Sequence, residues 1–126
     1  MGKTVAIVGA SADRRKFGNK AVRAYLDGGW SVYPINTKAD LIEGVPAYAT
    51  LADVPGAVDR VSMYVSPAIG KTMLDAIGEK APSELFFNPG SHDAELVDQA
   101  RKKGLNVVCA CSIVDIGKHP DMYPDS

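Results

Sequence analysis

The sequence lacks a long apolar run near its start, a large net charge and a cysteine framework. At its beginning only the run VAIV is continuously apolar, which is too short for a signal peptide or a membrane span. Its 14 basic and 15 acidic residues leave a net charge of −1, so no overall field attracts nucleic acid or an anionic membrane. With no export signal and only two cysteines, we expect a cytoplasmic protein.

The two cysteines, Cys109 and Cys111, are one residue apart, a poor spacing for a disulfide between them. Together with His119 they lack the spacing and the fourth ligand of a metal site, so no metal is expected. We expect both cysteines at a buried strand end. A catalytic Cys111 remains an alternative, although its base, His92 or His119, has no place fixed by the sequence.

What the chain does have is apolar content, 46% of 126 residues, enough for one core without disulfides or metal. We therefore expect a single domain over residues 1–126. Residues 115–126 contain two prolines and little periodicity, so this peripheral tail is expected to lie on the surface or fray. A small sheet with an exposed edge is also compatible with a homodimer.

Short runs rich in valine and isoleucine alternate with helical patterns, as in a parallel sheet covered on both faces. The expected fold class is α/β: a single Rossmann-like three-layer domain with a five-stranded parallel sheet, in the order 3-2-1-4-5. The strands are expected at residues 4–8, 31–35, 60–65, 84–87 and 106–110.

Three longer helices are expected between these strands. Asn19 is expected to cap the first, and Ser66 the second, with Pro67 at its first helical position. Ser91 is expected to cap the third. Between the second and third strands we expect a loop punctuated by proline and glycine, with one short helix at residues 50–54.

The loop after the first strand begins with three small residues, Gly9, Ala10 and Ser11. Small residues let backbone amides approach an anion at the start of a helix, and Arg14 and Arg15 follow at once. The dinucleotide fingerprint G-x-G-x-x-G is broken, since Ser11 replaces its second glycine and Arg14 its third. The loop thus predicts a site for more than one phosphate; the alternative is a tight turn with a solvated basic face.

The loop after the second strand argues against NAD. An NAD site usually has an acidic residue here for the ribose hydroxyls, whereas this chain has Asn36 and Lys38. A lysine attracts phosphate, which favours a nucleotide phosphorylated on its ribose, either NADP or coenzyme A. An ordinary surface lysine is the alternative.

Two later loops, YVSPAIG and FFNPGSH, each place a proline just after a strand. A proline ring is flat and apolar, so it can form a wall beside an adenine or a pantetheine arm. Both prolines are equally compatible with simple strand termination.

Together these motifs resemble a known family. The order VAIVGAS with a later Gly18, VYPINTK, TLADVPGAVDRVSMYVSP, LFFNPGS and GLNVVCACSIV resembles the stand-alone CoA-binding domain family, over about residues 3–114. Those proteins are similar to the N-terminal CoA-binding domain of the succinyl-CoA synthetase α subunit. This sequence departs from the pattern at Thr37, commonly proline, and at FNPG, where many members have a longer glutamine-glycine version.

The resemblance implies a role for each loop: the first holds the pyrophosphate, the second the ribose and 3′-phosphate, and the two proline loops line the rest of the coenzyme. The implied residues, in chain order, are Gly9, Ala10, Ser11, Arg14, Arg15, Gly18, Asn36, Lys38, Val65, Ser66, Pro67, Asn88, Pro89 and Gly90.

We therefore expect a module that binds coenzyme A or an acyl-CoA through its 3′-phospho-ADP moiety. A non-catalytic binding or regulatory role is expected, because the synthetase's phosphohistidine chemistry needs a second domain and a partner subunit. The alternatives are a small NADP- or thiol-dependent enzyme using Cys111, and an interaction domain that has lost its ligand.

Overall fold

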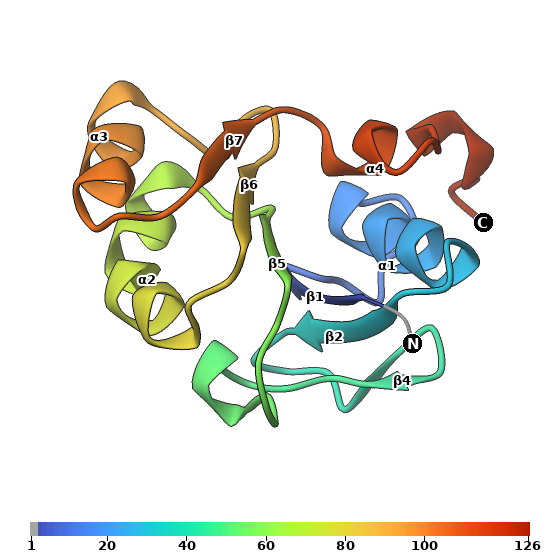
Figure 1. The fold of residues 1–126 in the computed structure, drawn as a ribbon. Coiled ribbons are helices and arrows are strands. Elements are labelled where there is room, and N and C mark those ends of the chain that lie inside the picture. Colours follow the sequence, from blue (N-terminus) through green and yellow to red (C-terminus); the bar gives the residue numbers. More distant parts are fainter. Residues whose placement is uncertain (1–2) are drawn as a thin grey trace.

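The computed structural model describes residues 3–126, which form a sheet between two layers of helices (Figure 1). Its five parallel strands are β1 (Thr4–Val8), β2 (Ser31–Ile35), β5 (Arg60–Met63), β6 (Glu84–Phe87) and β7 (Val107–Cys109). The α/β class and the parallel five-stranded sheet are thus confirmed. The third and fifth strands are shorter than expected, since they end at Met63 and Cys109.

The strands lie in the order β2-β1-β5-β6-β7. Beyond β2, Tyr48 forms a single parallel bridge with Ile35, and its amide donates to the Pro34 carbonyl at 2.8 Å. With Tyr48 counted as the third strand, the order reads 3-2-1-4-5-6, which contains the expected Rossmann-like 3-2-1-4-5 pattern and adds β7 at the far edge. The segment in that position is this short bridge rather than β5, which pairs with β1 on its other side.

Within residues 3–126, four α-helices cover the two faces of the sheet (Figure 1). On one face lie α1 (Phe17–Asp27) and α4 (Ser112–Asp115), and on the other α2 (Pro67–Lys80) and α3 (Ala94–Lys102). Side chains alternate along β1 accordingly: Val5 and Ile7 join the core beneath α1, whereas Ala6 and Val8 join the core beneath α2 and α3. None of the helices within residues 3–126 combines the length and apolarity needed to cross a bilayer.

One of the three expected helix caps is correct. Ser66 caps α2 by accepting from the Ile69 amide, but α1 begins at Phe17 with Lys16 as its cap. Asn19, expected there, is fully buried within α1, where its side chain has other partners. Asp93 rather than Ser91 caps α3. The buried Ser91 hydroxyl instead donates to the Asn88 carbonyl at 2.7 Å.

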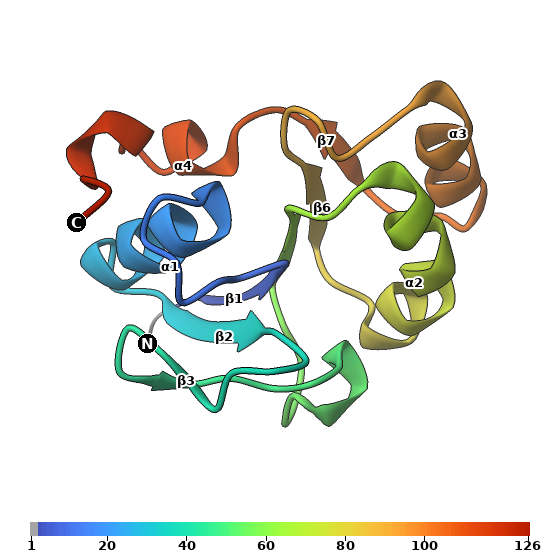
Figure 2. The same cartoon turned by 180° about the vertical axis from the view of Figure 1, so that it is seen from behind.

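The segment after β2 contains a hairpin that was not expected. Its strands β3 (Leu41–Ile42) and β4 (Val45–Pro46) are antiparallel and lie near the outer edge of β2 (Figure 2). A 3-10 helix at Leu51–Asp53 follows, within the short helix expected at residues 50–54.

Most residues of the tail are exposed, so it lies on the surface as expected, but it is packed against α1 rather than frayed. It follows directly on α4 and contains a 3-10 helix at Pro120–Met122, and the Tyr123 side chain is 5% exposed. The Arg23 guanidinium lies 5.7 Å from the Tyr123 ring centre and donates to the Pro124 carbonyl. These contacts fix the tail to α1.

Candidate functional site

A cleft of about 440 Å³ opens at the carboxyl ends of β1 and β2, between the 3-10 helix at Leu51–Asp53 and the start of α2. This is the position at which open α/β sheets bind ligands. No charged side chain lines it within the described residues. The lining residues are Val8, Gly9, Ala10, Ile35, Asn36, Thr37, Ala49, Thr50, Leu51, Ala52, Val65, Ile69, Thr72, Met73 and Ala76.

Two glycines determine how the loop after β1 meets α1. Gly9 has φ +86°, and a Cβ there would lie 2.8 Å from the Tyr64 carbonyl oxygen. At Gly18, a Cβ would lie only 2.2 Å from the Gly9 carbonyl oxygen. Only glycine permits this approach of helix and loop, which is the close packing that the third glycine of the dinucleotide fingerprint provides.

The Ser11 hydroxyl accepts from the Asp13 amide at 3.0 Å and so shapes the turn that leads into α1. The two arginines of this loop are both ion-paired. Arg15 pairs with Asp13, and its hydrogen bond lowers the pKa of that carboxyl to about 2. Arg14 binds Glu43 through two nitrogens, at 2.9 and 3.1 Å, and also donates to the Ser126 carbonyl.

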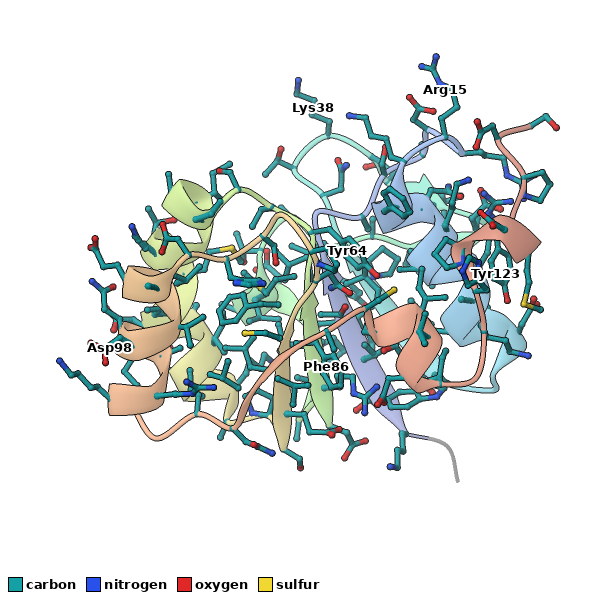
Figure 3. All side chains as sticks on the ribbon, turned by 90° about the horizontal axis from the view of Figure 1, so that it is seen from above. Arg15, Lys38, Tyr64, Phe86, Asp98 and Tyr123 are labelled. Carbon is teal, nitrogen blue, oxygen red and sulfur yellow. The ribbon has the colours of Figure 1, made fainter. Side chains whose placement is uncertain are left out.

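Asn36 joins the loop after β2 to the loop after β1. Its amide nitrogen donates to the Ala10 carbonyl at 2.8 Å, and its oxygen accepts from the Lys38 and Ala39 amides. The Lys38 side chain is exposed. In Figure 3 it extends from the same edge of the molecule as Arg15, far from Asp98 on α3.

The two proline loops lie differently. Val65 lines the cleft, and next to it Ser66 and Pro67 begin α2. Pro89 and Gly90 are exposed and are not among the residues that line the cleft. The structure therefore brings the first three predicted segments together and places the fourth apart from the cleft.

Asn88 is buried, and both ends of its side chain are engaged. Its amide nitrogen donates to the Ser62 hydroxyl and the Met63 carbonyl, each at 2.9 Å, while its oxygen accepts from the Ser112 amide at 2.8 Å. The Ser62 and Ser112 hydroxyl oxygens are 2.6 Å apart, and the Tyr64 hydroxyl lies 3.4 Å from that of Ser112. Burial raises the pKa of Tyr64. This network fixes the loop after β6 to the start of α4.

Cys109 lies at a strand end as expected, but both cysteines are more exposed than the sequence suggested. Cys109 at the end of β7 is exposed, because β7 is the last strand of the sheet, and Cys111 is half-buried. Neither makes a hydrogen bond to His92 or His119 within the described residues. Over residues 3–126, no group of three or more His, Cys, Asp or Glu side chains is placed to hold a metal ion.

Two features of the site escaped the sequence analysis. One is the apolar wall of the cleft, where Ile69 on α2 is 51% exposed and lies with Met73 opposite Leu51. The helical spacing of Ile69 and Met73 was the available signal, but it also fits a core face. The other is Glu43, which lies in the hairpin that was not expected.

Comparison with known proteins agrees with this geometry. A profile of the CoA binding domain family matches residues 3–116. The α subunit of acetate–CoA ligase [ADP-forming] II from Pyrococcus furiosus is 31% identical over 117 residues, covering 82% of this chain and 25% of that subunit. The chain spans about a quarter or less of the length of the curated relatives it matches.

Solved structures share the fold. A conserved hypothetical protein from Pyrococcus furiosus has a TM-score of 0.81 at 29% identity, over 91% of this chain and 99% of that one. Acetyl-coenzyme A synthetase 1 of Ca. Korarchaeum cryptofilum, solved with phosphate and ADP, has a TM-score of 0.76 at 27% identity, over 86% of this chain and 25% of that one. With the profile match over residues 3–116, this chain belongs to the CoA-binding domain family.

Proposed function

We propose that this chain binds coenzyme A, or an acyl-CoA, through the 3′-phospho-ADP moiety. The observation that carries the proposal is an uncharged cleft between a glycine loop and Lys38, at the carboxyl ends of β1 and β2. 3′-Phospho-ADP carries a pyrophosphate at the 5′ position and a separate phosphate at the 3′ position of its ribose, so it suits a neutral cleft with phosphate-binding groups on two rims. The volume of about 440 Å³ lies within the usual range for small-molecule sites.

In this proposal each part of the nucleotide has its own contacts. The adenine packs in the apolar part of the cleft, against Leu51, Ile69 and Met73. The backbone amides of the Gly9–Ser11 turn hold the pyrophosphate, since small residues allow a close approach. Lys38 meets the 3′-phosphate, where an acidic residue would repel it.

We propose that the two proline loops contact the remainder of the coenzyme. The pantetheine arm passes Val65 and Pro67 and extends toward Pro89 and Gly90. Asn88 supports that loop from behind, because its side-chain hydrogen bonds are already used within the protein.

We propose a binding or regulatory role without catalysis. The curated ligases that this chain resembles are several times longer, and the chain covers 25% of the α subunit from Pyrococcus furiosus. Recognition of the nucleotide needs only the cleft and its rims, all of which lie within this domain.

The test is a calorimetric titration of ligand-stripped protein with CoA, dephospho-CoA, NADP and NAD at one stated salt concentration. We expect CoA to bind with a Kd in the micromolar range or tighter, about −8 kcal/mol. NAD, which lacks both the 3′-phosphate and the pantetheine arm, should not bind measurably.

Other outcomes would redirect the proposal. Tighter binding of NADP than of CoA would favour the small-enzyme alternative, to be followed by an activity assay of a Cys111→Ser variant. If none of the four ligands binds, the glycine turn is structural and the interaction-domain alternative stands.

A further inference from the structure

The turn of the β3–β4 hairpin has an unusual residue in its first position. Register pairs Ile42 with Val45, so Glu43 and Gly44 form a two-residue loop, with φ values of +52° and +77°. Two positive φ values describe a type I′ turn, in which Asn-Gly or Asp-Gly is the preferred pair. Within residues 3–126 only Glu43 and Ala81 are non-glycine residues with positive φ. The backbone at residue 43 thus adopts a conformation that glutamate does not favour.

The Glu43 side chain is engaged at both oxygens and only 19% exposed. Oε1 accepts from Arg14 Nη2 at 2.9 Å. Oε2 accepts from Arg14 Nε at 3.1 Å and from Asn19 Nδ2 at 2.9 Å. The hydrogen bond from Arg14, followed by that from Asn19, lowers the pKa of Glu43, so the carboxylate is charged at neutral pH.

Through these two partners Glu43 reaches the loop that precedes α1. Asn19, which is fully buried, also donates to the Ser11 carbonyl at 2.9 Å. The Asn19 oxygen accepts from Arg23 Nε at 2.8 Å, and Arg23 in turn donates to the Arg14 carbonyl at 3.0 Å. The carbonyls of Ser11 and Arg14 are therefore both held by one hydrogen-bond network, in which Glu43 is bonded to Asn19 and to the Arg14 side chain.

We propose that Glu43 is a positioning residue for the nucleotide site: from the hairpin it holds the loop after β1 in the conformation in which its Gly9–Ser11 turn presents backbone amides to the pyrophosphate. This inference rests on the proposed function, since it assigns the pyrophosphate to that loop. Glu43 itself does not line the cleft. Its effect is to preorganise the loop, so that less conformational freedom is lost when the ligand binds.

The turn geometry offers a variant that separates this role from folding. Glu43→Asn supplies the residue that a type I′ turn prefers, while its shorter side chain leaves Arg14 and Asn19 without the carboxylate. The melting temperature should stay the same or rise. A matched control is Ala81→Asn, which makes the same kind of change at the other positive-φ residue, in the cap of α2. A second variant, Glu43→Gln, keeps the length but turns an NH₂ group toward donors of Arg14 or Asn19.

Binding of three ligands shows which part of the coenzyme is affected by the Glu43 substitutions. CoA and dephospho-CoA contain the pyrophosphate, whereas adenosine 3′-phosphate has the nucleoside and 3′-phosphate without it. Glu43→Asn should weaken CoA and dephospho-CoA by about tenfold each and leave adenosine 3′-phosphate within about twofold. Glu43→Gln should follow the same pattern, and Ala81→Asn should change none of the three.

Hydrogen exchange of the ligand-free proteins tests the same idea without a ligand. In Glu43→Asn the amides of residues 11–16 should exchange at least about tenfold faster, while those of β1 remain unchanged. This readout separates the two proposals. If wild-type protein binds no CoA, the proposed function fails, and faster exchange still shows that Glu43 orders the loop.

Three results would overturn the inference. Unchanged exchange together with unchanged affinities would remove any role for Glu43 in the loop. Equal losses for all three ligands would indicate a general structural effect. Tighter binding of CoA by Glu43→Asn would mean that Glu43 competes with the ligand for Arg14 rather than positioning the loop.

Discussion

At the scale of single residues, the basic side chains near the cleft differ in whether they already form an ion pair within the protein. Arg14 and Arg15 are each paired with a carboxylate, whereas the exposed Lys38 side chain has no ion pair within residues 3–126. Asn36 accepts from the Lys38 amide at 2.7 Å, so the backbone at this position is held while the side chain is not. Of these three residues, Lys38 is therefore the best placed to recognise an additional phosphate.

We expect Lys38→Ala to weaken CoA by about tenfold, roughly 1.4 kcal/mol, through loss of one charge-assisted contact. Dephospho-CoA lacks the 3′-phosphate, so its affinity should remain the same. Parallel calorimetric titrations of both ligands provide the comparison. Equal losses for the two would remove Lys38 from this role.

Gly18 is the residue at which the fold tolerates the least change. An alanine Cβ would lie 2.2 Å from the Gly9 carbonyl oxygen, so helix and loop would have to separate. We expect Gly18→Ala to destabilise the protein by about 3 kcal/mol, at the upper end for overpacking. The control is Gly78→Ala on the exposed side of α2, where no atom lies within 4 Å of the new Cβ. That change should stabilise by up to about 1 kcal/mol, as measured by urea unfolding.

At the scale of secondary-structure elements, the sequence was informative where local patterns decide the structure. The apolar runs located every strand of the parallel sheet, and the Ser66-Pro67 pair located the start of α2. The sequence was misleading where a side chain forms hydrogen bonds with a residue far away along the chain. Asn19 resembles a cap, but it is buried and bonded to Glu43, 24 residues away in the sequence. The hairpin was missed because each of its strands is two residues long, too short to show an alternating pattern.

The candidate site was predictable to the same extent. The loops after β1 and β2 follow apolar strands and carry small or polar residues, so their positions followed from the order of elements. The role of Asn88 could not be predicted, because its hydrogen-bond partner Ser112 lies 24 residues away along the chain. Glu43 gave no local signal either, since an acidic residue before a glycine fits any surface turn.

The cap of α3 provides a test at this scale. Asp93→Ala should lower the melting temperature, because Asp93 Oδ1 accepts from the Leu96 amide at 2.8 Å. That same hydrogen bond lowers the pKa of Asp93 in the folded state. The wild-type advantage should therefore be complete above the pKa of Asp in the unfolded chain, near 4, and disappear as the pH falls through the lower folded-state value.

A control for the cap lies one turn further along α3. Asp98→Ala changes an exposed carboxylate paired with Lys102 and should shift the melting temperature little. Thermal unfolding at a series of pH values from 2 to 7 compares the variants. A constant difference between wild type and Asp93→Ala across that range would contradict the assigned cap.

At the scale of the whole molecule, the tail acts as an additional layer over α1. It reaches the domain through Tyr123, through the Pro124 carbonyl, which accepts from Arg23, and through Asp125, which pairs with Lys20 at 2.7 Å. Sequence alone suggested a tail that lies on the surface or frays, because its prolines interrupt any periodic pattern. The buried Tyr123 ring and these polar contacts fix the tail, and periodicity over a whole helix or strand does not reveal them.

Two variants of Tyr123 separate packing from polarity. Tyr123→Ala should destabilise the protein by about 3 kcal/mol, because it removes a buried ring. The Tyr123 hydroxyl is buried without a hydrogen-bond partner in the described residues, so Tyr123→Phe should be neutral or stabilising by up to about 1 kcal/mol. Urea unfolding measures both. A loss for Tyr123→Phe as large as that for Tyr123→Ala would show that the hydroxyl, not the ring, holds the tail.

The contact between Gly9 and Gly18 bears on how such loops are recognised across distant relatives. Closure entropy grows slowly with loop length, by about 0.6 kcal/mol for each doubling, so residues can be inserted between the two glycines at little cost. The meeting of the two backbones, in contrast, leaves no room for a side chain. An insertion between the two glycines should therefore cost the fold less than a side chain at either of them. A sequence motif with a fixed spacing between the glycines would miss such a chain. A motif that allows a variable number of residues between the two glycines would find it.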